Sequence, residues 1–125
     1  MMHNMSTNSE TTRVERPWGE YCTINGGDYE GFKVKKIVVR PGCRLSLQSH
    51  ANRSEHWVIA RGVAKVQLGD EFTELRRNNY IYIPVNSKHR IENIGNEPLV
   101  FIETQIGDYL GEDDITRYED DYNRA

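Results

Sequence analysis

Long apolar runs, paired cysteines and an excess of basic charge are all missing from this 125-residue sequence. No apolar stretch approaches the roughly 20 residues that a membrane-spanning helix needs, so no membrane association is expected. Residues 1–12 are polar and lack the apolar core of a signal peptide. The formal net charge is −3, from 16 basic and 19 acidic residues, which argues against nucleic-acid binding.

The two cysteines, Cys22 and Cys43, are far apart and show no paired spacing. Neither a disulfide framework nor a cysteine-based zinc site is therefore expected, and reduced thiols are typical of a cytoplasmic protein. A chain of 125 residues buries enough surface for one ordinary core. We expect a disordered lead over residues 1–15 and a single domain over residues 16–125.

Short apolar segments separated by turn residues occupy most of the chain from about residue 18 onward. The segments that read as strands cover residues 19–24, 32–40, 44–50, 55–60, 64–69, 71–75, 80–84, 89–94 and 98–106. Many short strands at this spacing are typical of an all-β sandwich or barrel. Only residues 112–122 are expected to form a helix, a short C-terminal one, because acidic residues at its start suit the helix dipole.

Residues 47–57, LQSHANRSEHW, form a polar cluster that overlaps two of the expected strands. Residues two apart share a face of a strand, so Gln48 and His50 point the same way. Glu55 shares a face with Trp57, a candidate core residue, and is expected to point inward. His56 then points to the opposite side, where a structural role is expected.

A fourth polar group comes from His89, which opens a later strand. If that strand pairs across the barrel from the first two, two imidazoles, an amide oxygen and a carboxylate meet. This mixed set suits a divalent ion such as Zn²⁺, Mn²⁺, Fe²⁺, Co²⁺ or Ni²⁺, and coordination offsets the cost of burying polar groups. The alternative is a hydrogen-bonded polar core or a surface groove, which an isolated pair such as Gln48 and His50 would favour.

The spacing of this cluster resembles the first cupin motif, G-x5-H-x-H-x(3,4)-E-x6-G. The matching residues are Gly42, Gln48, His50, Glu55 and Gly62, and Gln48 replaces the first histidine.

The second cupin motif, P-x-G-x2-H-x3-N, is matched by Pro84, Asn86, His89 and Asn93. Asn86 replaces the glycine, a mild change because asparagine tolerates the left-handed conformation. The resemblance implies a double-stranded β-helix, the cupin or jelly-roll barrel. The metal ligands that it implies are Gln48, His50, Glu55 and His89.

A narrower resemblance covers almost the whole chain. The segments that carry it are RPWG (16–19), KVKKIVVRPG (33–42), LSLQSHANRSEHW (45–57), YIPVNSKHRIEN (82–93) and ETQIGDYLGEDDITRYEDDYNR (103–124). They are similar to the C-terminal isomerase domain of type II mannose-6-phosphate isomerases, which usually follows a mannose-1-phosphate guanylyltransferase domain. Glutamine is common at the first ligand position of that branch. Ala51 and Asn52 stand where the branch often has histidine, and no guanylyltransferase domain is expected in this chain.

This resemblance implies that the protein interconverts mannose 6-phosphate and fructose 6-phosphate through an enediol. Such chemistry needs one divalent metal as a Lewis acid, a base, and cations that hold the phosphate. Arg53, between two ligands, is the first candidate for a cation that faces the substrate, and a solvated loop arginine is its alternative. Glu103, on the last strand, is a candidate base.

Further candidates for binding the substrate are Lys33, Lys35 and Arg90. The two lysines share one strand face, but both faces carry apolar residues, so the opposite orientation stays open. Arg90 flanks His89, as does Lys88, for which a surface role is expected. The cupin resemblance also implies a homodimer. The competing hypotheses are a non-catalytic metal-containing cupin that binds a sugar or other metabolite, which the residues at positions 51 and 52 favour, and a different cupin enzyme.

Overall fold

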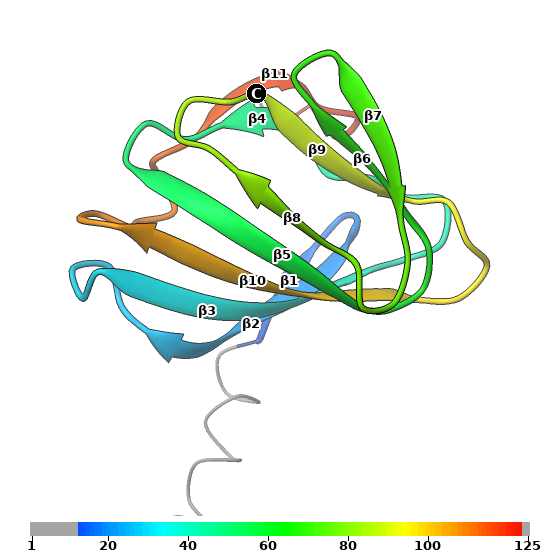
Figure 1. Cartoon of the computed structure of the whole chain (residues 1–125), viewed down its shortest axis with the longest axis horizontal. Coiled ribbons are helices and arrows are strands. Elements are labelled where there is room, and N and C mark those ends of the chain that lie inside the picture. Colours follow the sequence, from blue (N-terminus) through cyan, green and yellow to red (C-terminus); the bar gives the residue numbers. More distant parts are fainter. Residues whose placement is uncertain (1–12, 124–125) are drawn as a thin grey trace, which may run out of the picture.

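Two antiparallel β-sheets face each other in the computed structural model of the chain, which describes residues 13–123 (Figure 1). The strands are β1 (Arg13–Arg16), β2 (Gly19–Gly26), β3 (Phe32–Val39), β4 (Leu47–Ser49), β5 (Arg53–Arg61), β6 (Ala64–Leu68), β7 (Glu71–Leu75), β8 (Tyr80–Ile83), β9 (His89–Asn93), β10 (Leu99–Gly107) and β11 (Thr116–Glu119). One sheet has the order β1-β2-β3-β10-β5-β8 and the other β11-β4-β9-β6-β7. The expected all-β cupin barrel is therefore confirmed.

Alternation of buried and exposed residues explains why these segments form strands of a closed barrel. In β5 the side chains of Arg53, Glu55, Trp57 and Ile59 are buried, whereas those between them are less buried or exposed. Strand β10 lies between β3 and β5 and places Glu103 opposite Trp57. The same alternation runs along β3 and β10.

The inward faces of the central strands are apolar at one end of the barrel and polar at the other. Strand β3 changes from Lys33 and Lys35 to Ile37 and Val39, and all four side chains are buried. The main apolar cluster contains Ile37, Val39, Trp57, Ile59, Val66, Ile91, Leu99 and Phe101. This cluster stabilises one half of the barrel and leaves the other half to buried polar groups.

The predicted helix over residues 112–122 is wrong. Among the described residues this segment contains turns and strand β11, which pairs with β4. The reason is tertiary: Asp114 accepts hydrogen bonds from the amides of Ala51 and Asn52, each at 2.9 Å, and Asp121 pairs with Arg44 at 2.8 Å. These carboxylates therefore bind other parts of the chain instead of capping a helix of their own.

The first strand begins three residues before the expected start of the domain at residue 16. Strand β1 begins at Arg13 and pairs with β2, with Arg13 opposite Cys22. The rest of the predicted lead, residues 1–12, lies outside the described residues. Nine predicted strands are observed with small shifts at their ends; the largest is at 44–50, where only Leu47–Ser49 is a strand. No helix of the described chain is long and apolar enough to cross a membrane.

Candidate metal centre and substrate pocket

Three predicted ligands meet at the polar end of the barrel. His50 follows β4, Glu55 lies in β5 and His89 begins β9. Their candidate ligand atoms lie within 4.8 Å of one another, and all three residues are buried. Antiparallel pairing brings these segments together, since Gln48 lies directly opposite His89.

The turn before β9 links two of the ligands. Asn86 occupies the glycine position of the second cupin motif with φ of 66°, as its residue type allows. Its amide donates a hydrogen bond of 2.8 Å to the carbonyl oxygen of His50. The turn that positions His89 is therefore bonded to the segment that carries His50.

Both imidazoles present the nitrogen that a metal would need. The Nδ1 of His50 donates to the carbonyl oxygen of Asp114 at 2.7 Å, and that of His89 donates to the carbonyl oxygen of Ser87 at 2.8 Å. Carbonyl oxygens only accept, so each Nε2 keeps its lone pair. Burial lowers the pKa of His50 to about 4 and also lowers that of His89. Both rings are therefore neutral near pH 7, the form that binds metal.

Glu55 is an ionised carboxylate surrounded by donors. It accepts hydrogen bonds of 2.8 Å from Arg53 Nε and from Trp57 Nε1, and its oxygens lie 3.3 Å from His50 Nε2 and 4.0 Å from His89 Nε2. Burial alone would raise its pKa, but the charge of Arg53, together with smaller contributions from His89, His50 and Glu103, holds the pKa below its ordinary value.

Gln48 completes the set of donors. Its amide nitrogen donates to Ser46 Oγ at 2.9 Å and more weakly to the Ser46 carbonyl oxygen at 3.3 Å. These bonds orient the amide and leave its oxygen as an acceptor in the same cavity as Glu55 and His89. Two neutral imidazoles, a carboxylate and an amide oxygen fit a divalent transition metal.

A cavity of about 110 Å³ adjoins these groups. Gln48, Glu55 and His89 line one part of it, and apolar side chains such as Trp18 and Ile37 line another. Most of the residues that line the cavity are polar or charged, so it suits a polar, charged small molecule.

Arg53 and Glu103 both line this cavity and are buried. Besides its bond to Glu55, Arg53 has Nη2 at 3.2 Å from His50 Nε2, so it is not a solvated loop residue. Glu103 accepts a hydrogen bond of 2.6 Å from Gln105 Nε2. Burial and the neighbouring charge of Glu55 raise the pKa of Glu103 to about 8.

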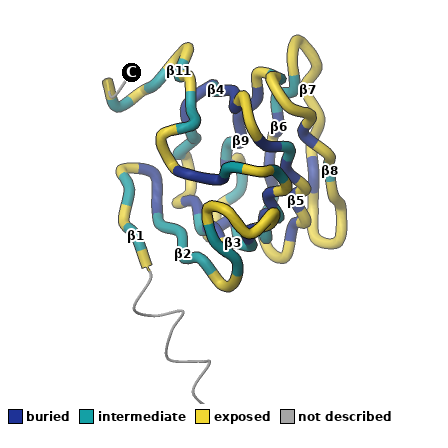
Figure 2. The backbone as a smooth tube through the Cα atoms, turned by 90° about the vertical axis from the view of Figure 1, so that its left-hand side faces the viewer, coloured by how far each residue is buried: buried dark blue, intermediate teal, exposed yellow. Residues whose placement is uncertain are grey.

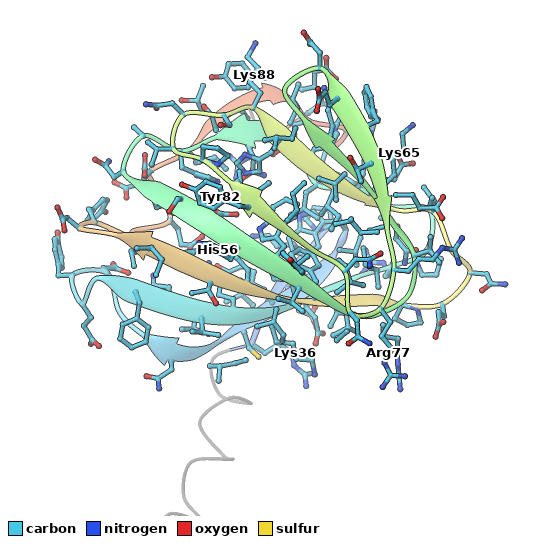
Figure 3. The ribbon with its side chains drawn as sticks, viewed as in Figure 1. Lys36, His56, Lys65, Arg77, Tyr82 and Lys88 are labelled. Carbon is cyan, nitrogen blue, oxygen red and sulfur yellow. The ribbon has the colours of Figure 1, made fainter. Side chains whose placement is uncertain are left out.

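The other predicted cations have different positions. Lys33 and Lys35 both point inward, which settles the orientation of β3, while Lys36 points outward (Figure 3). Lys35 lines the cavity and pairs with Glu112. Lys33 does not line it; it binds the carboxylate of Asp28 at 2.6 Å and the carbonyl of residue 110 at 2.8 Å.

Arg90 lines the cavity, but its guanidinium is occupied. Nε donates to the Leu45 carbonyl at 3.0 Å and Nη1 pairs with Glu119 at 3.2 Å. His56 points away from the site, with its ring 4.9 Å from that of Tyr82 on the outer face (Figure 3). Lys88 is exposed, as expected.

Four residues of the site were missed by the sequence reasoning: Arg16, Glu112, Asp114 and Arg117. Arg16, Glu112 and Arg117 line the cavity, and Asp114 orients His50. Three of them lie in the segment predicted to be a helix, where the acidic residues signalled a helix start. No local pattern marks them, because Thr116–Glu119 shows no regular alternation of buried and exposed residues.

Comparison with known proteins agrees with the family resemblance of the sequence. The family model described as "Mannose-6-phosphate isomerase C-terminal" matches residues 3–120. Xanthan biosynthesis protein XanB of Xanthomonas campestris pv. campestris (strain B100) is 51% identical over 113 residues, and the match covers 90% of this chain and 24% of that protein. Mannose-1-phosphate guanylyltransferase 2 of Escherichia coli O157:H7 is 50% identical over 109 residues, covering 87% and 22%.

The chain thus spans about a quarter of the length of the curated relatives it matches. Among solved structures, the Bacillus subtilis oxalate decarboxylase, a protein with Mn(II) centres, superposes with a TM-score of 0.72 at 23% identity. That match covers 86% of this chain and 30% of the other, and it shows the shared cupin fold. From the extent of the family match, the chain belongs to the family of mannose-6-phosphate isomerase C-terminal domains.

Proposed function

We propose that this domain is a metal-dependent aldose–ketose isomerase that interconverts mannose 6-phosphate and fructose 6-phosphate. The observation that carries the proposal is that a cavity lined by Glu55 and His89, two members of the His50–Glu55–His89 group, is also lined by a second buried carboxyl, Glu103. An isomerase of this type needs both a Lewis acid and a group that moves a proton. The sugar phosphate comes from the family and from the relatives' names.

Gln48, His50, Glu55 and His89 would hold the metal, which would polarise the carbonyl group of the sugar when bound. Glu103 lines the same cavity from β10 and would transfer the proton between C2 and C1 of the sugar. Gln105 holds the Glu103 carboxyl in place, and Trp18 and Ile37 line the apolar part of the same cavity.

The residues at positions 51 and 52 do not weigh against this function. Ala51 and Asn52 are exposed and do not line the cavity. Their backbone amides donate hydrogen bonds to the carboxylate of Asp114. Histidines at these positions are therefore not needed for the inner donor set. The homodimer expected from the cupin resemblance stays a prediction.

A coupled assay of mannose 6-phosphate conversion, with the metal removed and then restored, tests the proposal. We expect turnover to depend on one of the divalent ions Zn²⁺, Mn²⁺, Fe²⁺, Co²⁺ or Ni²⁺. Glu103→Gln should abolish turnover while metal occupancy is retained, because the change leaves the four donors in place. A folded protein that binds metal and gives no turnover with any of these ions would overturn the isomerase proposal.

The ligand assignment has its own test, with a histidine as matched control. His89→Ala and Gln48→Ala should each lower the metal content measured after dialysis. His56→Ala should leave it unchanged, because His56 lies on the outer face. Unchanged metal content in the first two variants would refute the assignment.

A further inference from the structure

Two arginines of the cavity come from edge strands of different sheets. Arg16 ends β1 and Arg117 lies in β11, and both line the cavity that Gln48, Glu55 and His89 also line. β1 and β11 are end strands in the order of their sheets, and both lie toward the same side of the barrel (Figure 2). The two side chains therefore reach one space from opposite sheets.

The other cations of the cavity already have acidic partners. Lys35 pairs with Glu112, Arg53 with Glu55 at 2.8 Å, and Arg90 with Glu119 at 3.2 Å. Within residues 13–123, neither Arg16 nor Arg117 forms an ion pair. The positive charge available to a ligand thus belongs to these two arginines.

Arg117 also carries an unused donor. Its Nε is buried and has no hydrogen-bond partner among the described residues. Burying a donor without a partner is unfavourable, and more so for a charged group, so an acceptor is expected there. Arg117 stands directly opposite Gln48 in the β4–β11 pair, beside the proposed metal centre.

Arg16 is held at the rim by weak contacts that leave most of its donors available. Its Nη1 donates to the carbonyl oxygen of Glu15 at 3.0 Å, and its guanidinium lies 5.4 Å from the ring centroid of Tyr21. Contact with an aromatic face orients a guanidinium without neutralising its charge.

We propose that Arg117, together with Arg16, binds the phosphate group of the substrate. The inference rests on the proposed function for the sugar but needs only a phosphate-type dianion as ligand. Guanidinium groups bind phosphate oxygens through paired, charge-assisted hydrogen bonds, which would satisfy the buried Nε of Arg117. The sugar phosphate then lies with its carbonyl end at Gln48, His50, Glu55 and His89 and its phosphate at Arg117.

The test uses inorganic phosphate as the probe, measured by calorimetry on metal-stripped protein so that phosphate cannot coordinate a metal. Arg117→Gln is expected to weaken phosphate binding 10- to 100-fold, the effect of losing one charge-assisted bond pair. Arg117→Lys should recover part of the affinity, and Arg16→Gln should cause a smaller loss. Arg77→Gln, an exposed arginine away from the cavity, is the matched control and should bind as the unmodified protein does.

Unchanged phosphate affinity in folded Arg117→Gln, Arg117→Lys and Arg16→Gln proteins would overturn the subsite. The kinetic counterpart is a rise in KM for mannose 6-phosphate in Arg117→Gln, with a smaller change in kcat. If the unmodified protein shows no isomerase turnover but its phosphate binding depends on Arg117, the subsite is supported and the proposed function fails. If the unmodified protein shows turnover but neither KM nor phosphate binding changes in the Arg117 variants, the proposed function is supported and the phosphate subsite fails.

Discussion

Replacing Asn93 with alanine is expected to destabilise the barrel at the end opposite the metal centre. Asn93 is fully buried, and its side chain makes three hydrogen bonds. Its Nδ2 donates to the carbonyl oxygens of Val39 and Glu97 at 2.8 and 2.9 Å, and its Oδ1 accepts from Gly95 N at 2.9 Å. It therefore ties the end of β9 to β3 and to the turn that leads into β10.

The expected loss of stability in Asn93→Ala follows from these three hydrogen bonds. Each contributes about 1 kcal/mol net, so their loss should lower the free energy of unfolding by about 3 kcal/mol, before any cost of leaving the backbone groups unpaired. With a urea dependence of about 2 kcal/mol/M, the unfolding midpoint should fall by about 1.5 M. Asn93→Asp should be at least as damaging, because it removes the donor that faces two carbonyl oxygens and buries a charge.

Urea unfolding followed by circular dichroism in the presence of a chelator measures this change without a contribution from bound metal. Asn96→Ala is the matched control: Asn96 is exposed in the same turn and should shift stability by no more than about 0.5 kcal/mol. If Asn93→Asp unfolds at the same urea concentration as the unmodified protein, the bonding pattern assigned to this motif asparagine is wrong.

Three further predictions concern the site and its supports. Trp57 donates to Glu55, so titration with Co²⁺ or Ni²⁺ should change tryptophan fluorescence, and Trp57→Phe should lose most of that change; an equal change in the variant would contradict the assignment. Burial raises the pKa of Glu112, but the Lys35 ammonium and other nearby cations hold it below its ordinary value of 4.5. The Lys35–Glu112 ion pair therefore stabilises the fold above about pH 4.5, and this stabilisation is lost as the pH falls below that value. Glu112→Gln should therefore flatten the acid side of a stability–pH curve, and an unchanged curve would refute the role of the pair. Gly107→Ala should lower the thermal midpoint, because the added Cβ would lie 2.2 Å from the carbonyl oxygen of residue 52, whereas Gly95→Ala, with 3.6 Å to its nearest atoms, should not; equal midpoints would show that the close approach is unimportant.

Local pattern in the sequence was enough for most of the barrel and for the inner donor set. Alternation with a period of two residues predicted nine strands and the inward direction of Glu55, because strand geometry depends mainly on neighbouring residues. The same rule places Gln48 and His50 on one face, and the resemblance to the first cupin motif adds Glu55 to the set. The second motif marks His89, but only the pairing of β4 with β9 brings it to the other candidate ligands.

Contacts between distant segments decided the rest. Asp114 binds His50 across 64 positions of the chain, and Arg117 reaches the cavity only because β11 pairs with β4. In isolation, residues 112–122 look like the start of a helix, since acidic residues favour a helix N-terminus. In the fold, their carboxylates gain partners on Lys35, Arg44 and the 51–52 amides, and these long-range bonds outweigh a weak local preference for helix. The sequence by itself thus determined the barrel and the candidate metal ligands, whereas the tertiary structure decided which charges are neutralised and which remain available for a ligand.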